Sequence, residues 1–263
     1  MNRVEQWPAE AYQQALELQT DGLMAVTHLA LLRPPGGKAC RGYVKHFIGQ
    51  GTQRCLFNEW FSYHVMGALG IPQPRCAMMA APVWGTLQLQ WAFVSCEPSP
   101  VHHGTPKQIY NMASAEHCKA LLARLLGCAL LPALIAADQL LANTDRNLGN
   151  LVFTGRDTFV AIDHSNALHG PNWTLAQLQS TQHPARMMLL DFMHHVNPVL
   201  PPNTANAIVA AAEVMEQAYY EHQDELRAVL GCSGHAPSAN AMDMTWWRCL
   251  KLAAWMRTAL GVI

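Results

Sequence analysis

The sequence carries little charge and no long run of one sign. Asp, Glu, Lys and Arg make up 13% of the 263 residues, the formal net charge is -1, and no stretch of four or more Lys or Arg occurs. Without a basic patch, no field draws the chain to nucleic acid or to an anionic membrane surface. We therefore expect neither as a partner. The hydrophobic fraction of 51% instead predicts a globular protein with a well-filled core.

Long apolar segments are also missing. The most apolar stretch, residues 125–137, is interrupted by Pro132 and is shorter than the roughly 20 residues that a membrane-spanning helix needs. We predict a buried core helix there. Residues 1–8 contain no apolar segment and do not resemble a secretory signal. These features together predict a cytoplasmic protein.

Motifs for metal ions and disulfides are absent, although cysteine and histidine are not. The eight cysteines are at least ten residues apart, so no C-x-x-C occurs, and the thirteen histidines form no H-E-x-x-H. We expect reduced thiols that mostly fill the core. We expect no zinc site and no histidine cluster for a metal.

The pattern of apolar and turn residues predicts an α+β protein with a β-rich first part and a mainly helical remainder. Amphipathic spacing predicts a helix at residues 8–20, and a second helix is predicted at residues 56–69 with Gly70 as its stop. Strands are predicted at residues 23–26, 29–32, 42–48, 83–89 and 91–94. After residue 114 helices predominate, apart from a hairpin of residues 151–153 and 158–162. We predict two lobes, residues 1–97 and 98–263, with a hinge near residues 94–100. Ligands often bind between lobes.

The most informative stretch is Asn143-Thr-Asp-Arg-Asn-Leu-Gly-Asn150, followed by the predicted hairpin and then Asp163. A loop, a hairpin and an acidic residue at its exit would bring Asp145, Asn150 and Asp163 to one edge. In a kinase such residues orient the attacking hydroxyl and bind Mg²⁺, which prefers oxygen ligands. The alternative is that Asp145 is a turn residue in a polar loop. The full pattern is more restrictive than an Asp-Arg pair, and we favour the functional interpretation.

Two upstream residues fit the same hypothesis. Lys45 lies in the middle of a predicted strand, and Glu59 lies on the helix that follows, where it could anchor a phosphate-binding lysine. The alternatives are a solvated strand face and a favourable charge in the first turn of a helix. Pro34-Pro-Gly-Gly37 could approach phosphate, but a plain hairpin turn is the better interpretation. Asp138 is predicted to hold Arg146 or the loop backbone, since a half-buried carboxylate needs partners.

With these residues assembled, the chain resembles the HipA-like kinases, a bacterial branch near the phosphatidylinositol-kinase and protein-kinase folds. The segments that carry the resemblance lie within residues 20–168 and are Tyr43-Val-Lys-His-Phe47, Asn58-Glu59 with Leu69-Gly-Ile-Pro-Gln-Pro74, residues 138–150 and Val160-Ala-Ile-Asp163. The resemblance implies a two-lobed protein-kinase-like fold that binds ATP and Mg²⁺.

The same resemblance implies a role for each residue. Lys45 would hold the phosphates, Glu59 would position Lys45, and Asp145 would be the catalytic base. Asn150 and Asp163 would bind the metal. All five residues occur in the expected order along the chain.

The chain also departs from the family. Asn147 stands where the family commonly has His, the metal motif is Asp-His-Ser, and the glycine-rich loop matches poorly. The chain is shorter than the HipA toxins, and we expect it to lack their extra N-terminal region. The protein substrates of the toxins are therefore not inferred for this chain. We predict an ATP- and Mg²⁺-dependent Ser/Thr protein kinase, with a protein substrate and an antitoxin-like partner as the suggested partners. The alternatives are a pseudokinase that binds nucleotide and a nucleotidyl transferase on the same fold.

Overall fold

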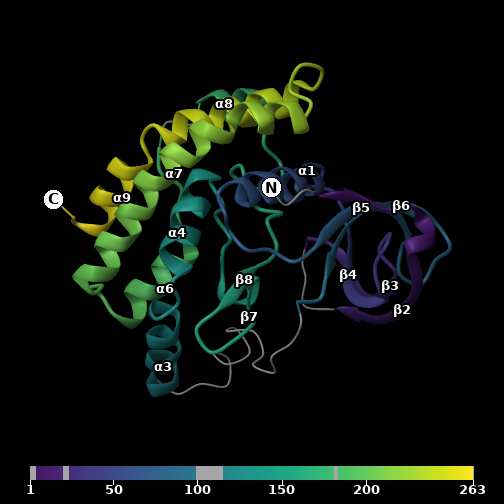
Figure 1. Ribbon diagram of the computed structural model, residues 1–263, viewed down its shortest axis with the longest axis horizontal. Coiled ribbons are helices and arrows are strands. Elements are labelled where there is room, and N and C mark those ends of the chain that lie inside the picture. Colours follow the sequence, from purple (N-terminus) through teal and green to yellow (C-terminus); the bar gives the residue numbers. More distant parts are fainter. Residues whose placement is uncertain (1–3, 20–23, 99–114, 181–182, 263) are drawn as a thin grey trace.

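The computed structural model describes residues 4–19, 24–98, 115–180 and 183–262. It has a mixed α+β fold, with a six-stranded sheet at one end and most of the helices at the other (Figure 1). The strands occur along this sheet in the order β1 (Glu5–Gln6), β5 (Cys76–Pro82), β6 (Leu89–Cys96), β4 (Cys40–His46), β3 (Val26–Leu32) and β2 (Tyr12–Gln19). Only β1 and β5 are parallel neighbours, and the other pairs are antiparallel.

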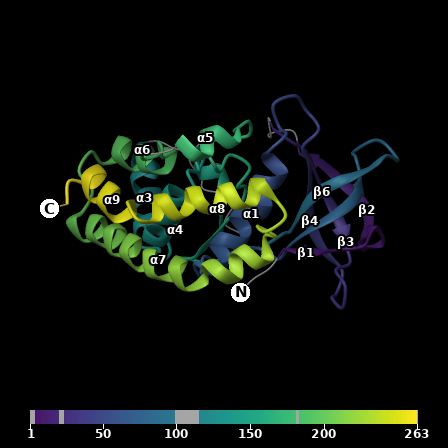
Figure 2. The same cartoon turned by 90° about the horizontal axis from the view of Figure 1, so that it is seen from above.

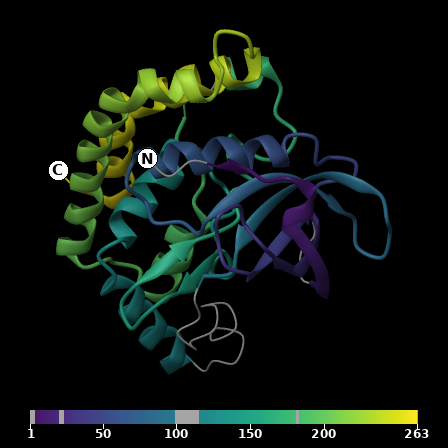
Figure 3. The ribbon, with the colours of Figure 1, turned by 45° about the vertical axis from the view of Figure 1, so that its right-hand side comes forward.

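The helix α1 (Cys55–Ala68) lies between the sheet and the remaining helices (Figure 2). Those helices are α3 (Ala115–Leu126), α4 (Leu131–Leu140), α5 (Leu175–Ser180), α6 (Met188–Val196), α7 (Pro202–Val229), α8 (Ala236–Cys249) and α9 (Leu252–Leu260). A short hairpin of β7 (Leu151–Phe153) and β8 (Phe159–Ala161) lies below α1, between the helices and the sheet (Figure 3). Short 3₁₀ turns, η1 (Ala9–Ala11) and η2 (Leu148–Asn150), precede β2 and β7.

The helix α1 belongs to two hydrophobic clusters. Its residues Phe61 and Val65 pack into the large helical core around α4, whereas Tyr63 packs with Phe93 of β6. Burial alternates along β4, where Val44 is buried with the sheet core and its neighbour Lys45 is on the other face. Because Lys45 pairs with Phe93 across the sheet, Lys45 lies on the face that α1 covers.

Three predicted elements are confirmed. The strand around Lys45 is β4, the helix at 56–69 is α1, and the hairpin after the polar loop is β7–β8. The stop predicted for α1 is also present, since Gly70 has a φ of +73° and the backbone then leaves the helix. The predicted strand at 91–94 is part of β6.

Two predictions for the first third of the chain are wrong. Residues 8–19 of the predicted helix 8–20 are not helical, because η1 and then the edge strand β2 follow Pro8, and residue 20 lies outside the described residues. Antiparallel pairing with β3 overrides a composition rich in helix formers. Residues 83–88 are a turn, with Gly85 at a φ of +73°, rather than a strand. The strand lies earlier, at β5, whose Met and Ala residues give little β-signal.

The other expectations need smaller corrections. The predicted strands at 23–26 and 29–32 form one strand, β3, which begins at Val26, and residue 23 lies outside the described residues. The apolar stretch 125–137 is not one helix, because α3 ends at Leu126 and α4 begins at Leu131 with Pro132 in its first turn. The hinge predicted near 94–100 runs from β6 into residues 99 and 100, which are also outside the described part.

No single helix in the described ranges is long and apolar enough to cross a bilayer. One consecutive pair, Glu116–Leu126 and Leu131–Leu140, passes by combined length and composition but is bent by 86°.

Candidate functional site

An ammonium group lies between two carboxylates that come from different parts of the chain. Lys45 of β4 places its Nζ 2.8 Å from Oε1 of Glu59 on α1 and 3.3 Å from Oδ1 of Asp163, which follows β8. The Glu59 side chain is fully buried, whereas the Asp163 side chain is 37% exposed. The structure therefore brings three of the five predicted site residues into direct contact, with Asp163 on the solvent side.

The positive charge of Lys45 and the negative charges of Glu59 and Asp163 stabilise one another. Burial alone would lower the pKa of Lys45, but Asp163 and Glu59 together raise the pKa above its usual value. Burial raises the pKa of Glu59, and the charge of Lys45 acts against this rise. Burial would also raise the pKa of Asp163. The charge of Lys45 and the hydrogen bonds from Ser165 outweigh this effect of burial, and the pKa of Asp163 lies well below its usual range. Lys45 is therefore protonated and Asp163 ionised at neutral pH.

The polar loop is built around one buried guanidinium group. Arg146 donates from Nε to Oδ2 of Asp138 at 2.9 Å, and its Nη1 reaches the carbonyl oxygens of Asn150 and Ile162. The predicted role of Asp138 as the partner of Arg146 is thus confirmed. Burial raises the pKa of Asp138, while the charge and hydrogen bonds of Arg146 oppose that rise. A paired, hydrogen-bonded charge is the form in which such groups tolerate burial.

His164 joins this loop to α1. Its Nδ1 is 2.8 Å from a nitrogen of Arg146, and its Nε2 is 3.0 Å from Oε1 of Gln73. An arginine can only donate, so Nδ1 must accept and Nε2 must carry the proton. Burial and the charge of Arg146 hold the pKa of His164 well below its usual value, in agreement with this neutral ring. The backbone N–H of His164 donates to Oε2 of Glu59 at 2.9 Å.

The carboxylate of Asp145 is contacted by two amide side chains. Nδ2 of Asn147 lies 3.3 Å from Oδ1, and Nδ2 of Asn166 lies 3.2 Å from Oδ2. Asn150 donates from its own Nδ2 to the backbone oxygen of Asp145 at 2.8 Å, and its backbone oxygen accepts from the N–H of Ile162 at 3.0 Å. The loop and the segment after β8 are therefore held together directly. Asn147 and Asn166 thus support the carboxylate of Asp145.

Two oxygen atoms at the site have the chemistry that Mg²⁺ prefers. Among the described residues, no hydrogen bond reaches Oδ1 of Asn150 or Oδ2 of Asp163. Carboxylate and amide oxygens are hard ligands, and Mg²⁺ usually takes only one or two carboxylates from a protein. These residues fit such an ion. Within the described ranges, no group of three or more His, Cys, Asp or Glu side chains is arranged for a metal.

Asn58 is a structural residue of the site that the sequence did not assign. It is fully buried on α1, and its Nδ2 lies 2.8–2.9 Å from the carbonyl oxygens of Ser165, Ala167 and Gly170. Its Oδ1 accepts from Nε1 of Trp173 at 2.8 Å. The signal in the sequence was an asparagine next to Glu59 in a mainly apolar helix, a position where a buried amide needs partners.

The glycine-containing turn lies away from Lys45. The N–H of Gly37 donates to the oxygen of Pro34 at 3.0 Å, which closes a turn between β3 and β4. This turn follows the Leu32–Cys40 end of the strand pair, whereas Lys45 pairs with Thr27 near the other end. Lys45 is five steps along the strand from Cys40, or about 17 Å at roughly 3.4 Å per residue. The interpretation as a hairpin turn is confirmed, and the turn does not approach the ammonium group.

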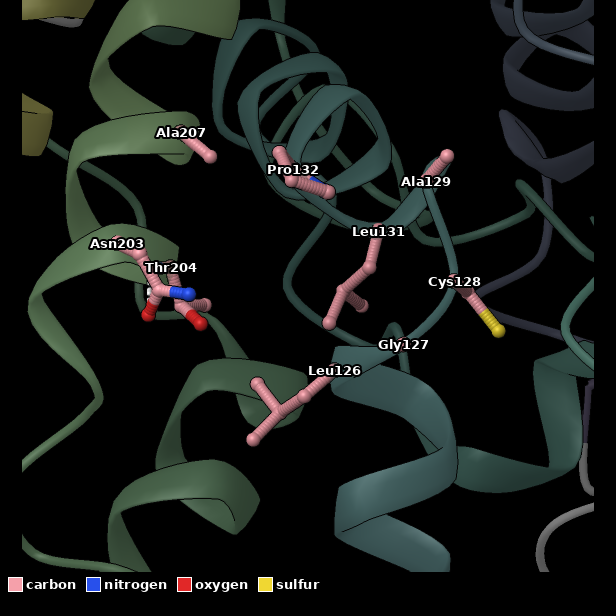
Figure 4. A pocket seen from close by; sticks show the side chains of 9 residues that line it. All are labelled: Leu126, Gly127, Cys128, Ala129, Leu131, Pro132, Asn203, Thr204 and Ala207. Carbon is pink, nitrogen blue, oxygen red and sulfur yellow. Dashed lines mark hydrogen bonds between the residues drawn. The ribbon is translucent and has the colours of Figure 1, made fainter.

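Two of the cavities in the described part of the chain lie away from these residues. One of about 270 Å³ lies between the corner that joins α3 to α4 and the first turns of α7, where Leu131, Pro132, Asn203 and Thr204 line it (Figure 4). The other, of about 480 Å³, lies beside α1 and β1 and is lined by Trp60 and Trp91 among others. None of the five predicted site residues lines either cavity.

Comparison with known proteins does not assign this geometry to a family. The chain matches no protein-family model, and no curated protein matches it.

Proposed function

We propose that the protein is an ATP- and Mg²⁺-dependent phosphotransferase that acts on a Ser or Thr hydroxyl of a protein. The observation that carries the proposal is the ammonium of Lys45, 2.8 Å from Glu59 and 3.3 Å from Asp163. In protein kinases, a strand lysine paired with a helix glutamate contacts the phosphates, and an aspartate after the catalytic loop holds the metal. Residues of the same types meet here in the same chain order.

The strand order gives independent support. The strands β2, β3 and β4 form a meander with Lys45 on its third strand, and α1 with Glu59 follows before β5 and β6. β6 then pairs with β4 rather than with β2. We infer a two-lobed, protein-kinase-like arrangement of residues 1–97 and 98–263, with the nucleotide bound between the lobes, since ligand sites favour such interfaces.

Each residue has a definite task in the proposed reaction. The Lys45 ammonium binds phosphate oxygens and neutralises their charge, and Glu59 holds it in place. Asp145 orients the attacking hydroxyl and accepts its proton, while Asn150 and Asp163 hold Mg²⁺. When bound, Mg²⁺-ATP supplies the phosphoryl group and part of the charge neutralisation. Phosphoryl transfer depends mostly on positioning and electrostatics, so these fixed charges are suited to the task.

A nucleotide-binding module without turnover is the second candidate. The observation that favours it is the pair of amides on the Asp145 carboxylate, one from Asn147 and one from Asn166. A base in phosphotransfer has to present an oxygen to the hydroxyl, and both oxygens here accept a hydrogen bond. The contacts measure 3.3 Å and 3.2 Å, which is long for a charge-assisted bond, so a substrate hydroxyl can compete for the carboxylate.

The experiment measures Mg²⁺-ATP binding by calorimetry and phosphotransfer with [γ-³²P]ATP on the same preparations. We expect Asp163→Ala to abolish binding and Asp145→Ala to retain binding but lose label. Asp157→Ala is the matched control, because Asp157 is 56% exposed on the β7–β8 turn. Its binding and labelling should equal those of the wild type.

Each of the other outcomes has a defined meaning. Full labelling by Asp145→Ala would refute the base assignment, and a wild type that does not bind Mg²⁺-ATP would refute the proposal. Binding without transfer would favour the second candidate. Mass spectrometry of the product separates an added phosphate from an added AMP, and an added AMP would indicate nucleotidyl transfer on this fold.

A further inference from the structure

Two thiols face each other between the central strands β4 and β6, at the end of β4 away from Lys45. Cys40 begins β4, Cys96 ends β6, and their Sγ atoms are 3.5 Å apart. The strand register pairs Gly42 with Cys96, so Cys40 is two residues from that partner and on the same face of the sheet. Both side chains are half-buried, and both are free thiols. No other pair of sulfur atoms in the described residues is in hydrogen-bond contact.

The surroundings of this pair include a cation. The pKa of Arg75 is raised mainly by the hydrogen bonds that its guanidinium donates to Glu5, and to a smaller extent by the charges that Cys96 and Cys40 carry as thiolates. The guanidinium is therefore close enough to interact with both sulfur atoms. The carbonyl oxygen of Arg75 also accepts from the backbone N–H of Cys96 at 2.8 Å. A nearby cation stabilises a thiolate, the form of cysteine that attacks disulfides. Burial acts in the opposite direction on Cys96 and raises its pKa to about 12.

We propose that Cys40 and Cys96 are a modification site at which the two cysteines form a reversible disulfide with each other. The oxidant is a small-molecule disulfide such as oxidised glutathione. One protein thiolate attacks the reagent and releases a small thiolate, and the mixed disulfide is then attacked by the second protein thiolate. The second small thiolate leaves, and the two protons of the protein thiols end on the two released thiols. Two cysteines are oxidised and one small disulfide is reduced.

The backbone at this position can accommodate the bond. The sulfur atoms must approach from 3.5 Å to about 2.05 Å. Cys40 is the first residue of β4 and Cys96 the last of β6, so the required movement falls at strand ends rather than within the ladder. The next residues are already joined, because the N–H of Glu97 donates to the oxygen of Arg41 at 2.8 Å. The disulfide would covalently link β4, which carries Lys45, to the end of β6, where the chain leaves the sheet. This consequence does not depend on whether the protein transfers phosphate.

The test uses the full chain. The protein is incubated with oxidised glutathione, its remaining thiols are blocked with N-ethylmaleimide, and it is digested with trypsin without reduction. Cleavage after Lys38 and Arg41 places Cys40 in the peptide 39–41, and Cys96 falls with Cys76 in the peptide 76–107. We expect these two peptides to be linked, with fragment ions that assign the bond to Cys96 and with loss of the link on adding dithiothreitol. Glutathione adducts alone, or a bond to any other cysteine, would overturn the proposal.

Variants separate this pair from the neighbouring thiol. Cys40→Ser and Cys96→Ser should each lose the linked peptide, whereas the matched control Cys76→Ser should retain it. A link that persists in Cys96→Ser would contradict the assignment. Oxidised wild type should also melt several degrees above the reduced protein, because the bond closes a loop from residue 40 to residue 96. Equal melting temperatures would show that the bond does not restrain the sheet.

Discussion

Replacing Asn58 with Asp changes one buried group without changing its shape. The amide nitrogen of Asn58 contacts the carbonyl oxygens of Ser165, Ala167 and Gly170, and its oxygen accepts from Trp173. In Asn58→Asp, the contact with Trp173 survives, but an oxygen replaces the donor that faced the three carbonyls. The folded state then has several acceptors and no donor in a fully buried position.

The size of the effect follows from these contacts. A buried polar group left without its partner costs about 1–3 kcal/mol, and a buried carboxylate adds a desolvation cost. We expect Asn58→Asp to lower the free energy of unfolding by roughly 3–5 kcal/mol at neutral pH, out of a total of about 5–15 kcal/mol for a domain. Asn58→Ala is the matched control, because it also removes the donor but introduces no charge. We expect it to cost about 2–4 kcal/mol.

The pH dependence separates the two variants. Burial raises the pKa of the introduced carboxyl group in the folded state above its unfolded value of about 3.9. Between these two pKa values the folded state binds more protons, so the stability of Asn58→Asp falls as pH rises through that window. Its deficit relative to the wild type should therefore be smallest below about pH 4 and largest at neutral pH. The deficit of Asn58→Ala should not change with pH.

Urea unfolding followed by far-UV circular dichroism measures both deficits at several pH values, each relative to wild type in the same buffer. Tryptophan fluorescence gives a second signal, because Trp173 loses its hydrogen bond only in Asn58→Ala. A deficit for Asn58→Asp that is independent of pH, or that is below about 1 kcal/mol at neutral pH, would refute this account of the buried amide.

The remaining predictions concern three other buried groups. Burial lowers the pKa of His28 to about 4, so wild-type stability should fall as pH drops from about 6.5 towards about 4. When the urea midpoint of unfolding is plotted against pH, His28→Phe should make this part of the curve flatter. A wild-type profile that is flat over this range would contradict the prediction. Glu59→Gln removes the charge that holds Lys45, and calorimetry should show Mg²⁺-ATP binding weakened at least tenfold; unchanged affinity would contradict the proposed anchoring. Arg146→Met leaves the carboxylate of Asp138 buried and unpaired, and chemical denaturation should show a loss of about 3–5 kcal/mol. Adding Asp138→Asn should recover part of that loss, and strict additivity would argue against direct coupling.

The sequence predicted elements whose local pattern agrees with their packing. The helix α1 has a long apolar pattern and a glycine stop, and β7–β8 is two apolar runs around a turn. The edge strand β2 was missed because its side chains are mostly exposed and its residues favour helices, so only pairing with β3 reveals it. The strand β5 was missed because its buried Met and Ala residues lack the β-branched and aromatic signal of most strands.

The site shows the same limit. Lys45, Glu59 and Asp163 were proposed from their residue types and their order along the chain. The structure places the carboxylates of Glu59 and Asp163 within 3.3 Å of Lys45 Nζ. The roles of Asn58 and Asn166 depend on contacts with residues 107 and 21 positions away in the chain, which no local pattern encodes. Side-chain chemistry suggests which groups need partners, but the partners come from the fold.

The position of Asp163 depends on two parts of the chain at once. Asp163 has a φ of +60°, which is uncommon for a residue other than glycine and is kept only where surrounding contacts hold it. Arg146 donates to the backbone oxygen of the preceding residue, Ile162, and Glu59 accepts from the N–H of the following residue, His164. The same Glu59 binds Lys45, so the group that holds the ammonium also fixes the backbone beside the exposed carboxylate. A change at Arg146 or Glu59 should therefore displace Asp163 without altering its side chain, and the ammonium and this carboxylate behave as one unit.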